Sequence, residues 1–278
     1  MAPTWDPDQY LRFATERERP FWDLVARIPT LGPRQVVDLG CGPGTATAGL
    51  LDHWPTATVR GIDSSPAMLE QAQDRARPPR LTFELGDLVT WQPEQESLDV
   101  VVSNAVLHWV PGHLELFARW LAALRPEGAL AFQVPGNSSA PSHARLRELA
   151  RSGPWKEKLA TVGDAVEVPE PVRYHQRLRE LGAAVDLWET TYYHVLSGPD
   201  PVVAWLRGSA LRPYLAALDP EEAAGFTASY GEAMRAAYPP GPDGTTLLPF
   251  RRVFVVASRP RASQGARRSD RPSRDGTS

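Results

Sequence analysis

Residues 36–45 read Val36-Val37-Asp38-Leu39-Gly40-Cys41-Gly42-Pro43-Gly44-Thr45. An apolar run typical of a buried strand ends at an acidic residue, and three alternating glycines precede a helix-forming stretch. Glycine permits a tight turn and lets the backbone approach a ligand without an intervening Cβ atom. The stretch therefore predicts the first strand–helix turn of an α/β sheet, with a nucleotide-like ligand bound there.

The composition limits the classes of function. The chain has 278 residues, of which 42% are hydrophobic, enough for one large α/β domain or a core with a sizeable insertion. A net charge of −3 does not favour nucleic acid or an anionic membrane as the main partner. The single cysteine, Cys41, excludes an internal disulfide and a multi-cysteine zinc site, and we expect no metal. Without a targeting segment or a bilayer span, a soluble cytoplasmic protein is expected, and the oligomeric state is undetermined.

Strands and helices are predicted to alternate along the first half of the chain. Segments rich in Val, Leu, Ile and aromatic residues are expected to be strands at 35–39, 58–62, 81–85, 98–103, 129–134, 184–194 and 252–257. Helical patterns lie at 45–53, 68–75, 114–124 and 172–181. Glu127-Gly128 is predicted to stop the helix that precedes the fifth strand. The alternation favours a parallel, doubly wound, seven-stranded Rossmann-like sheet.

The later part of the chain departs from this alternation. Residues 135–170 and 197–249 are irregular, and we expect these two insertions to form a mainly helical cap over the carboxyl edge of the sheet, where α/β proteins bind ligands. The other expected divisions are N-terminal lid helices at 1–30, a ligand-binding core at 31–134 that continues at 171–196, a last core strand at 250–258 and a disordered tail at 259–278.

The spacing of the glycines indicates which ligand the turn accepts. A dinucleotide site requires Gly-x-Gly-x-x-Gly, whereas this turn has Gly40-x-Gly42-x-Gly44. Asp38 precedes the first glycine by two residues, where it would repel a pyrophosphate but suit a cationic or amine-bearing ligand. An NAD-dependent oxidoreductase therefore remains only an alternative.

Further polar residues follow successive strands. Asp63 follows the second strand and could accept both hydroxyls of a ribose, Asp87 follows the third and suits an exocyclic amine, and Asn104 follows the fourth. Each also has an ordinary structural interpretation, with Asp63 as a helix N-cap, Asp87 as a loop residue and Met68 as core filler. Their order along the chain favours a shared ligand over three independent turns.

With these motifs, residues 35–134 resemble the class I S-adenosylmethionine-dependent methyltransferases. The resemblance implies that the glycines contact the methionine part of the cofactor and that Asp38 holds its amino group. It implies that the residues after the second and third strands hold the ribose and the adenine. The residue after the fourth strand would contact the methionine part through its backbone. The implied cofactor-binding residues are Asp38, Gly40, Gly42, Gly44, Asp63, Ser64, Met68, Asp87, Leu88 and Asn104.

The outer segments resemble the trans-aconitate 2-methyltransferases. They are residues 5–13 with Arg19-Pro20, residues 107–110, 205–215 and 248–257. The resemblance implies an O-methyltransferase that esterifies one carboxylate of this planar tricarboxylate to a monomethyl ester. Leu206 and Ser209 stand where the family pattern usually has an aromatic residue and a threonine. Another small or carrier-bound carboxylic acid, and a non-catalytic protein that keeps the fold, remain alternatives.

A tricarboxylate substrate carries about three negative charges at neutral pH and requires compensation in a closed pocket, preferably from guanidinium groups. The candidate substrate-binding residues are His108, Trp109, Arg207, Arg212, Tyr214 and Arg251, with Arg17 and Arg19 as weaker candidates on the lid. Arg251 and Arg252 alternate across a strand, so only one can face the pocket. An ionised carboxylate requires no catalytic base. His108 is expected to orient the acceptor, or else to pack beside Trp109.

Overall fold

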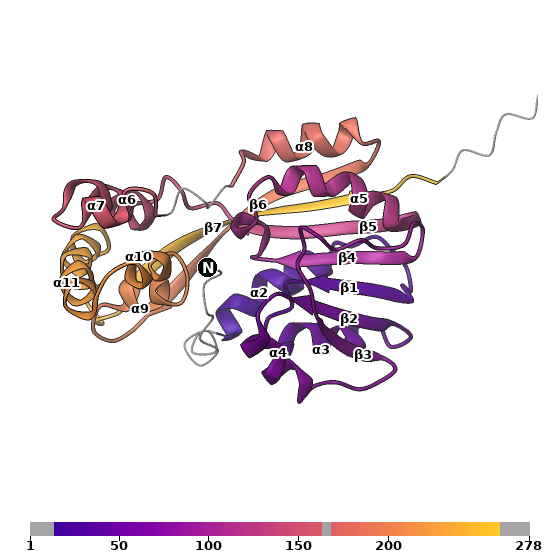
Figure 1. Cartoon of the computed structure of the whole chain (residues 1–278), viewed down its shortest axis with the longest axis horizontal. Helices are drawn as coiled ribbons and strands as arrows, with labels where there is room; N and C mark the ends of the chain where they lie inside the picture. Colours follow the sequence, from indigo (N-terminus) through magenta and orange to yellow (C-terminus); the bar gives the residue numbers. More distant parts are fainter. Residues whose placement is uncertain (1–13, 163–167, 262–278) are drawn as a thin grey trace, which may run out of the picture.

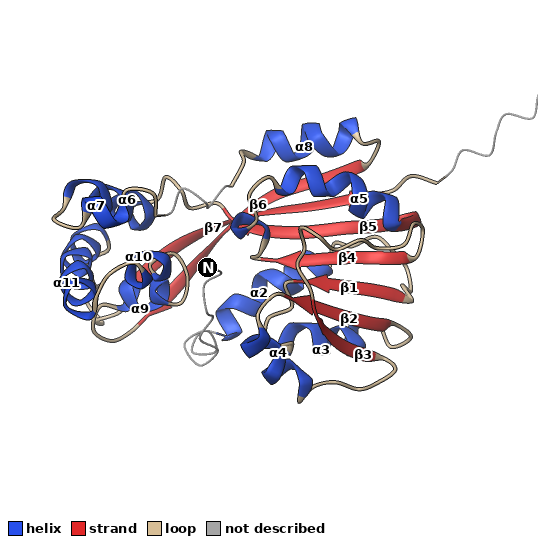
Figure 2. Ribbon diagram, in the orientation of Figure 1, coloured by secondary structure: helices blue, strands red, loops and turns tan. Residues whose placement is uncertain are grey.

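The computed structural model describes residues 14–162 and 168–261, and its centre is a seven-stranded sheet in the order β3-β2-β1-β4-β5-β7-β6 (Figures 1 and 2). The strands are β1 (Gln35–Leu39), β2 (Thr58–Asp63), β3 (Leu81–Leu85), β4 (Leu98–Asn104), β5 (Leu124–Pro135), β6 (Ala184–Leu196) and β7 (Thr246–Ser258). The order reverses between β1 and β4, the position at which open α/β sheets bind ligands.

Strands β1 to β5 are parallel, as predicted, but β7 pairs antiparallel with both β5 and β6. The prediction of a wholly parallel sheet is therefore wrong for the last strand. The chain leaves the sheet along β6, forms helices beyond its edge, and returns directly along β7. This return needs no crossover, so the two strands run in opposite directions.

Helices cover both faces of the sheet, which confirms the doubly wound class. Helices α2 (Ala14–Val25), α3 (Thr45–His53) and α4 (Pro66–Gln73) pack on one face, where Val36 points. Helices α5 (Phe117–Ala123) and α8 (Pro171–Glu180) pack on the other, where Val37 points, with the short 3-10 helices η1 (Leu107–Trp109) and η2 (His113–Leu116). Figure 1 shows α5 and α8 on the opposite side of the sheet from α2, α3 and α4.

A helical cap stands beyond the carboxyl ends of the parallel strands. It contains α6 (Pro141–Ser152), α7 (Lys156–Leu159), α9 (Pro201–Arg207), α10 (Arg212–Ala216) and α11 (Pro220–Ala237). These helices share a hydrophobic cluster of their own with Leu196 of β6 and with Leu248 and Phe250 of β7. Figure 1 shows the ends of β6 and β7 reaching from the sheet into this cap. The cap is therefore mounted on an antiparallel ribbon that continues two core strands.

Several element boundaries differ from the sequence prediction. Strand β5 begins at Leu124, so Glu127-Gly128 lies inside the strand and does not stop a helix, which ends at Ala123. Glu127 instead has a positive φ of 68°, in a stretch where the pairing of β4 with β5 shifts register between Leu98 and Val100. Strands β6 and β7 are longer than predicted because they pair with each other as far as Leu196 and Thr246.

Some predictions fall on residues outside the described ranges. They concern residues 1–13 of the lid, 163–167 of the first insertion and 262–278 of the tail. Within the described ranges, no helix is long and apolar enough to cross a membrane.

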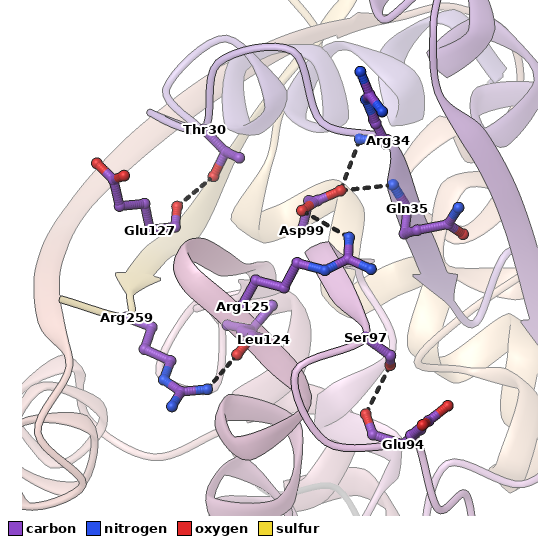
Figure 3. Close-up of polar contacts among 10 residues, drawn as sticks. All are labelled: Thr30, Arg34, Gln35, Glu94, Ser97, Asp99, Leu124, Arg125, Glu127 and Arg259. Atoms are coloured by element: carbon purple, nitrogen blue, oxygen red, sulfur yellow. Dashed lines mark hydrogen bonds and ion pairs between the residues drawn. The ribbon is translucent and has the colours of Figure 1, made fainter. Parts of the chain in front are cut away.

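Asp99 joins three elements at the amino edge of the sheet (Figure 3). Its Oδ2 accepts hydrogen bonds of 2.8 Å from the backbone amides of Arg34 and Gln35, and its Oδ1 accepts one of 3.1 Å from Arg125. Burial raises the pKa of Asp99, but these hydrogen bonds outweigh it and hold the pKa below its usual value. This cluster secures the edge opposite the predicted ligand site.

Candidate active site

The glycine turn after β1 has a backbone that only glycine adopts readily. Gly40, Gly42 and Gly44 have φ values of 77°, 56° and 76°. A Cβ atom on Gly40 would lie 2.2 Å from Val106 Cγ2, whereas one on Gly42 would meet no described atom within 4 Å. Gly40 is therefore required by packing inside the protein, and Gly42 faces open space in which a ligand can approach the backbone.

Asp38 places a buried carboxyl beside this turn. Its side chain is 3% exposed, and its Oδ2 accepts a 2.6 Å hydrogen bond from Thr47 Oγ1. Burial raises the pKa of Asp38 to about 7; the bond from Thr47 opposes the shift and the charge of Asp63 adds to it. A cationic ligand group beside Asp38 would favour its charged form.

Asp63, at the end of β2, is tied to the glycine turn. Its Oδ2 accepts a 2.8 Å bond from the Gly42 amide and its Oδ1 a 2.9 Å bond from the Ser65 amide. Ser65, not Asp63, is the N-cap of α4, and it accepts from the Met68 amide. Because each carboxylate oxygen has more than one lone-pair site, Asp63 can still accept hydrogen bonds from a ligand.

The remaining predicted cofactor residues lie along the same edge. Ser64 and Asp87 are exposed, Met68 and Leu88 are 3% and 5% exposed, and Asp87 accepts a 2.8 Å bond from the Val89 amide.

Buried polar atoms at the ends of β4 and β5 also point to a ligand. Asn104 and Gln133 are register partners, and Gln133 is wholly buried. Asn104 Oδ1 and both amide atoms of Gln133 have no hydrogen-bond partner among the described residues. A buried polar group without a partner is costly, so a bound ligand that supplied one would explain these side chains.

A pocket of about 390 Å³ lies between the sheet and the cap, within the range of roughly 300–1,000 Å³ usual for small-molecule sites. Its walls come from η1, the end of β5 and the segment after it, helix α6, the segment before α8, helix α10 with the segment that leads into it, and β7. The described lining residues are His108, Trp109, Pro135, Asn137, Ser138, His143, Leu146, Arg147, Val168, Ser209, Ala210, Pro213, Tyr214 and Phe250.

His108 lines the core wall of this pocket. It is 7% exposed, its ring centroid lies 4.8 Å from that of Trp109, and its Nδ1 has no hydrogen-bond partner in the described part of the chain. Burial, together with the charges of Arg252 and two neighbouring histidines, lowers the pKa of His108 to about 3. The imidazole is therefore neutral near pH 7 and is suited to hydrogen bonding but not to acid catalysis.

Two residues of α6, His143 and Arg147, line the cap wall. His143 Nδ1 lies 3.0 Å from Ser142 Oγ, and burial with the charge of Arg147 lowers the pKa of His143 to about 4. Arg147 is half-buried and donates a hydrogen bond to the Ser138 carbonyl. Both residues lie on one face of α6, one turn apart.

The sequence places the chain among known proteins. The family model described as a methyltransferase domain matches residues 36–128. The chain is 50% identical to a trans-aconitate 2-methyltransferase of Streptomyces avermitilis, over 92% of this chain and 97% of that protein. It is 52% identical to one of Streptomyces coelicolor, over 94% and 89%. The chain belongs to the trans-aconitate 2-methyltransferase family.

The family membership removes the oxidoreductase alternative and agrees with the fold. A solved structure of phosphoethanolamine N-methyltransferase 2 from Haemonchus contortus, in complex with S-adenosyl-L-methionine, superimposes with a TM-score of 0.54 at 16% identity, over 87% of this chain and 53% of that one. The shared architecture is that of class I S-adenosylmethionine-dependent methyltransferases, which confirms the predicted fold class.

Some of the predicted substrate-binding residues are among the described residues that line the pocket, and the others are not. His108, Trp109 and Tyr214 line the pocket, whereas its described lining residues do not include Arg207, Arg212 or Arg251. Arg207 is exposed and Arg212 is half-buried.

Of the two arginines that alternate on β7, Arg251 forms an ion pair with Glu189, and Arg252 lies inside the protein. Arg252 is 5% exposed, with its guanidinium carbon 4.7 Å from the ring centroid of Phe250. On helix α2, the exposed Arg19 lies over the Tyr192 ring, and the side chain of Arg17 is outside the described ones. The roles of these arginines in binding stay predictions.

His143, Arg147 and Gln133 were not predicted from the sequence, and Arg252 was named only as the alternative to Arg251. A helical spacing of four in residues 141–152 could have placed His143 and Arg147 on one face. No local signal shows that this face borders a cavity.

Proposed function

We propose that this protein transfers a methyl group from S-adenosylmethionine to one carboxylate of trans-aconitate and releases a monomethyl ester. The observation that supports it best is the pocket between η1 and α6, which joins the carboxyl edge of the sheet to basic and imidazole side chains of the cap. The described residues that line it include no aspartate or glutamate. The name of the relatives supports the choice of acid.

The residues at the carboxyl edge fit the proposed cofactor. The buried Asp38 carboxyl matches its amino group, and the open face of Gly42 admits its methionine part. The residues proposed to hold it are Asp38, Gly40, Gly42, Gly44, Asp63, Ser64, Met68, Asp87, Leu88 and Asn104. When bound there, the cofactor supplies a methyl group activated by its sulfonium centre.

The acceptor oxygen needs no activation by a base. A carboxylic acid with a pKa near 4 is ionised at neutral pH, so no proton has to be removed. His108 is neutral under the same conditions because burial holds its pKa at about 3. Its proposed role is to orient the acceptor by a hydrogen bond, while the walls of the pocket limit the access of water to the carboxylate.

The partner and location in the cell follow from the same proposal. A small tricarboxylate is the proposed partner, and the net charge of −3 does not favour nucleic acid or an anionic membrane in its place. A cytoplasmic location is also proposed, and the single cysteine is compatible with it.

Incubation with labelled S-adenosylmethionine and four acids, trans-aconitate, cis-aconitate, isocitrate and citrate, tests the function. We expect label that is released by mild base, as from an ester, on trans-aconitate above the other three. Label on none of the four would contradict the proposal. Preferential label on a different acid would support carboxyl methylation but would contradict trans-aconitate as the substrate.

A further inference from the structure

The pocket has two walls of different origin. The core wall contains His108 and Trp109 of η1, which follows β4 and therefore lies beside Asn104 and the glycine turn. The cap wall contains His143, Leu146 and Arg147 of α6. A carboxylate that accepts a methyl group must lie near the core wall, where the proposed donor binds. The other carboxylates of the same acid then extend toward the cap.

Arg147 is the one formally charged side chain among the described residues that line the pocket. Its hydrogen bond to the Ser138 carbonyl uses one of five guanidinium N–H groups, so the planar fork can still bind a carboxylate through two donors. The same hydrogen bond holds the side chain over the segment that follows β5. Arg147 is therefore held at the pocket and keeps donors for an anion.

His143 lies one turn before Arg147 and is held in place by the cap. Ser142, its neighbour, donates its amide to the Tyr238 hydroxyl at 3.2 Å and accepts at its carbonyl from the Tyr230 hydroxyl at 2.7 Å. The contact of His143 Nδ1 with Ser142 Oγ leaves Nε2 as the ring nitrogen that a ligand can meet. Side chains one turn apart on a helix have Cβ atoms about 5–6 Å apart, so one small ligand can contact both.

We propose that Arg147, together with His143, forms an anion subsite on the cap that binds a second, non-reacting carboxylate of the acceptor and thereby selects acids with two or more carboxylates. This inference rests on the proposed function, because the subsite belongs to the acceptor pocket. It assigns the choice of acid to α6 and leaves methyl transfer itself to the core wall.

The test compares two arginines of one helix. Arg147→Ala removes the charge that lines the pocket, and Arg145→Ala removes an exposed charge of the same helix that pairs with Glu148. Because hydrogen bonds to a charged group contribute strongly, we expect Arg147→Ala to raise the KM for trans-aconitate roughly 10- to 100-fold with a small change in kcat. Crotonate, a planar unsaturated acid with one carboxylate, should be a poor substrate of both the wild type and Arg147→Ala. Its kcat/KM should differ less than threefold between these two proteins. Arg145→Ala should match the wild type.

Direct binding separates this inference from the proposed function. Calorimetric titration of wild type and Arg147→Ala with trans-aconitate, and with S-adenosylhomocysteine as a control, requires no turnover. Binding of the acid that Arg147→Ala weakens, without methylation by wild type, would keep the subsite and reject the function. Methylation by wild type with an unchanged KM in Arg147→Ala would reject the subsite alone. Equal losses for crotonate and trans-aconitate would also overturn it. Arg147→Lys keeps the charge but not the planar fork, so its KM for trans-aconitate should lie between those of the wild type and Arg147→Ala. This variant replaces Arg147→Ala in the test if the alanine variant does not fold.

Discussion

Replacing Gly42 by alanine separates ligand contact from backbone strain at the glycine turn. The residue has a φ of +56°, and an added Cβ would meet no atom within 4 Å in the described structure. A left-handed backbone costs an L-residue about 1–2 kcal/mol, so Gly42→Ala should lower the free energy of unfolding by about this amount. The melting temperature should fall by a few degrees.

The same methyl group should impair cofactor binding more strongly. It occupies the space through which the ligand approaches the Gly42 backbone, and an inserted methyl in a packed contact costs about 1–3 kcal/mol. The Kd for S-adenosylhomocysteine should rise roughly 5- to 150-fold. At a ligand concentration of 100 times the wild-type Kd, ligand stabilises the wild type by about 2.7 kcal/mol, and a tenfold weaker variant by only about 1.4 kcal/mol.

Gly182→Ala is the matched control. Gly182 also has a positive φ, +83°, with no described atom within 4 Å of an added Cβ, but it follows α8, away from the carboxyl edge. Urea denaturation should show a similar loss of stability in both variants, and calorimetric titration should show weaker binding in Gly42→Ala alone. Equal affinities in the two variants would refute the placement of the ligand at Gly42.

Three further predictions concern the buried polar groups. Because the pKa of the ligand-free Asp38 carboxyl is raised to about 7, a cationic ligand group must displace a proton at lower pH. Calorimetric affinity for S-adenosylhomocysteine should therefore rise from pH 5.5 to pH 7 in the wild type and stay low and flat in Asp38→Asn; a wild type without this slope would contradict the assignment. Gln133→Met removes a buried side-chain amide that has no described partner. The free energy of unfolding of the ligand-free variant, measured by urea denaturation, should therefore rise by about 1–3 kcal/mol, and the variant should bind ligand less tightly. A loss of stability would show that the amide already has hydrogen-bond partners. Asp99→Ala should lower the free energy of unfolding by about 1–3 kcal/mol at pH 7 without a change in the KM for trans-aconitate. Because the folded pKa of Asp99 is lowered, the ionic part of its contribution is fully present above the unfolded pKa of about 4 and is lost as the pH falls through the lower folded pKa, so the difference in stability between the two proteins should shrink in acid; a constant difference would exclude the ion as the cause.

The sequence allowed the core of the fold to be predicted because its signals are local. The strand at Gln35–Leu39 and the helix at Thr45–His53 match the structure residue for residue. The three glycines have the positive φ angles that their pattern indicates. Glu127 shows the limit of such signals, since a residue expected in a helix stop lies in a strand with a left-handed backbone. Glu127 lies where the pairing of β5 with β4 shifts register, a feature that depends on a strand distant in sequence.

The position of the proposed acceptor pocket depended on contacts between segments far apart in the chain. The arginines singled out in the sequence, among them Arg207 and Arg251, are absent from the described lining residues, and Arg147 of α6 is present. The glycine spacing and the leading Asp38 determined the backbone of the cofactor turn, because φ angles and strand ends are properties of neighbouring residues. Only the tertiary structure decided which charges border the cavity, because that depends on how α6 packs against the rest of the cap and on the antiparallel return of β7.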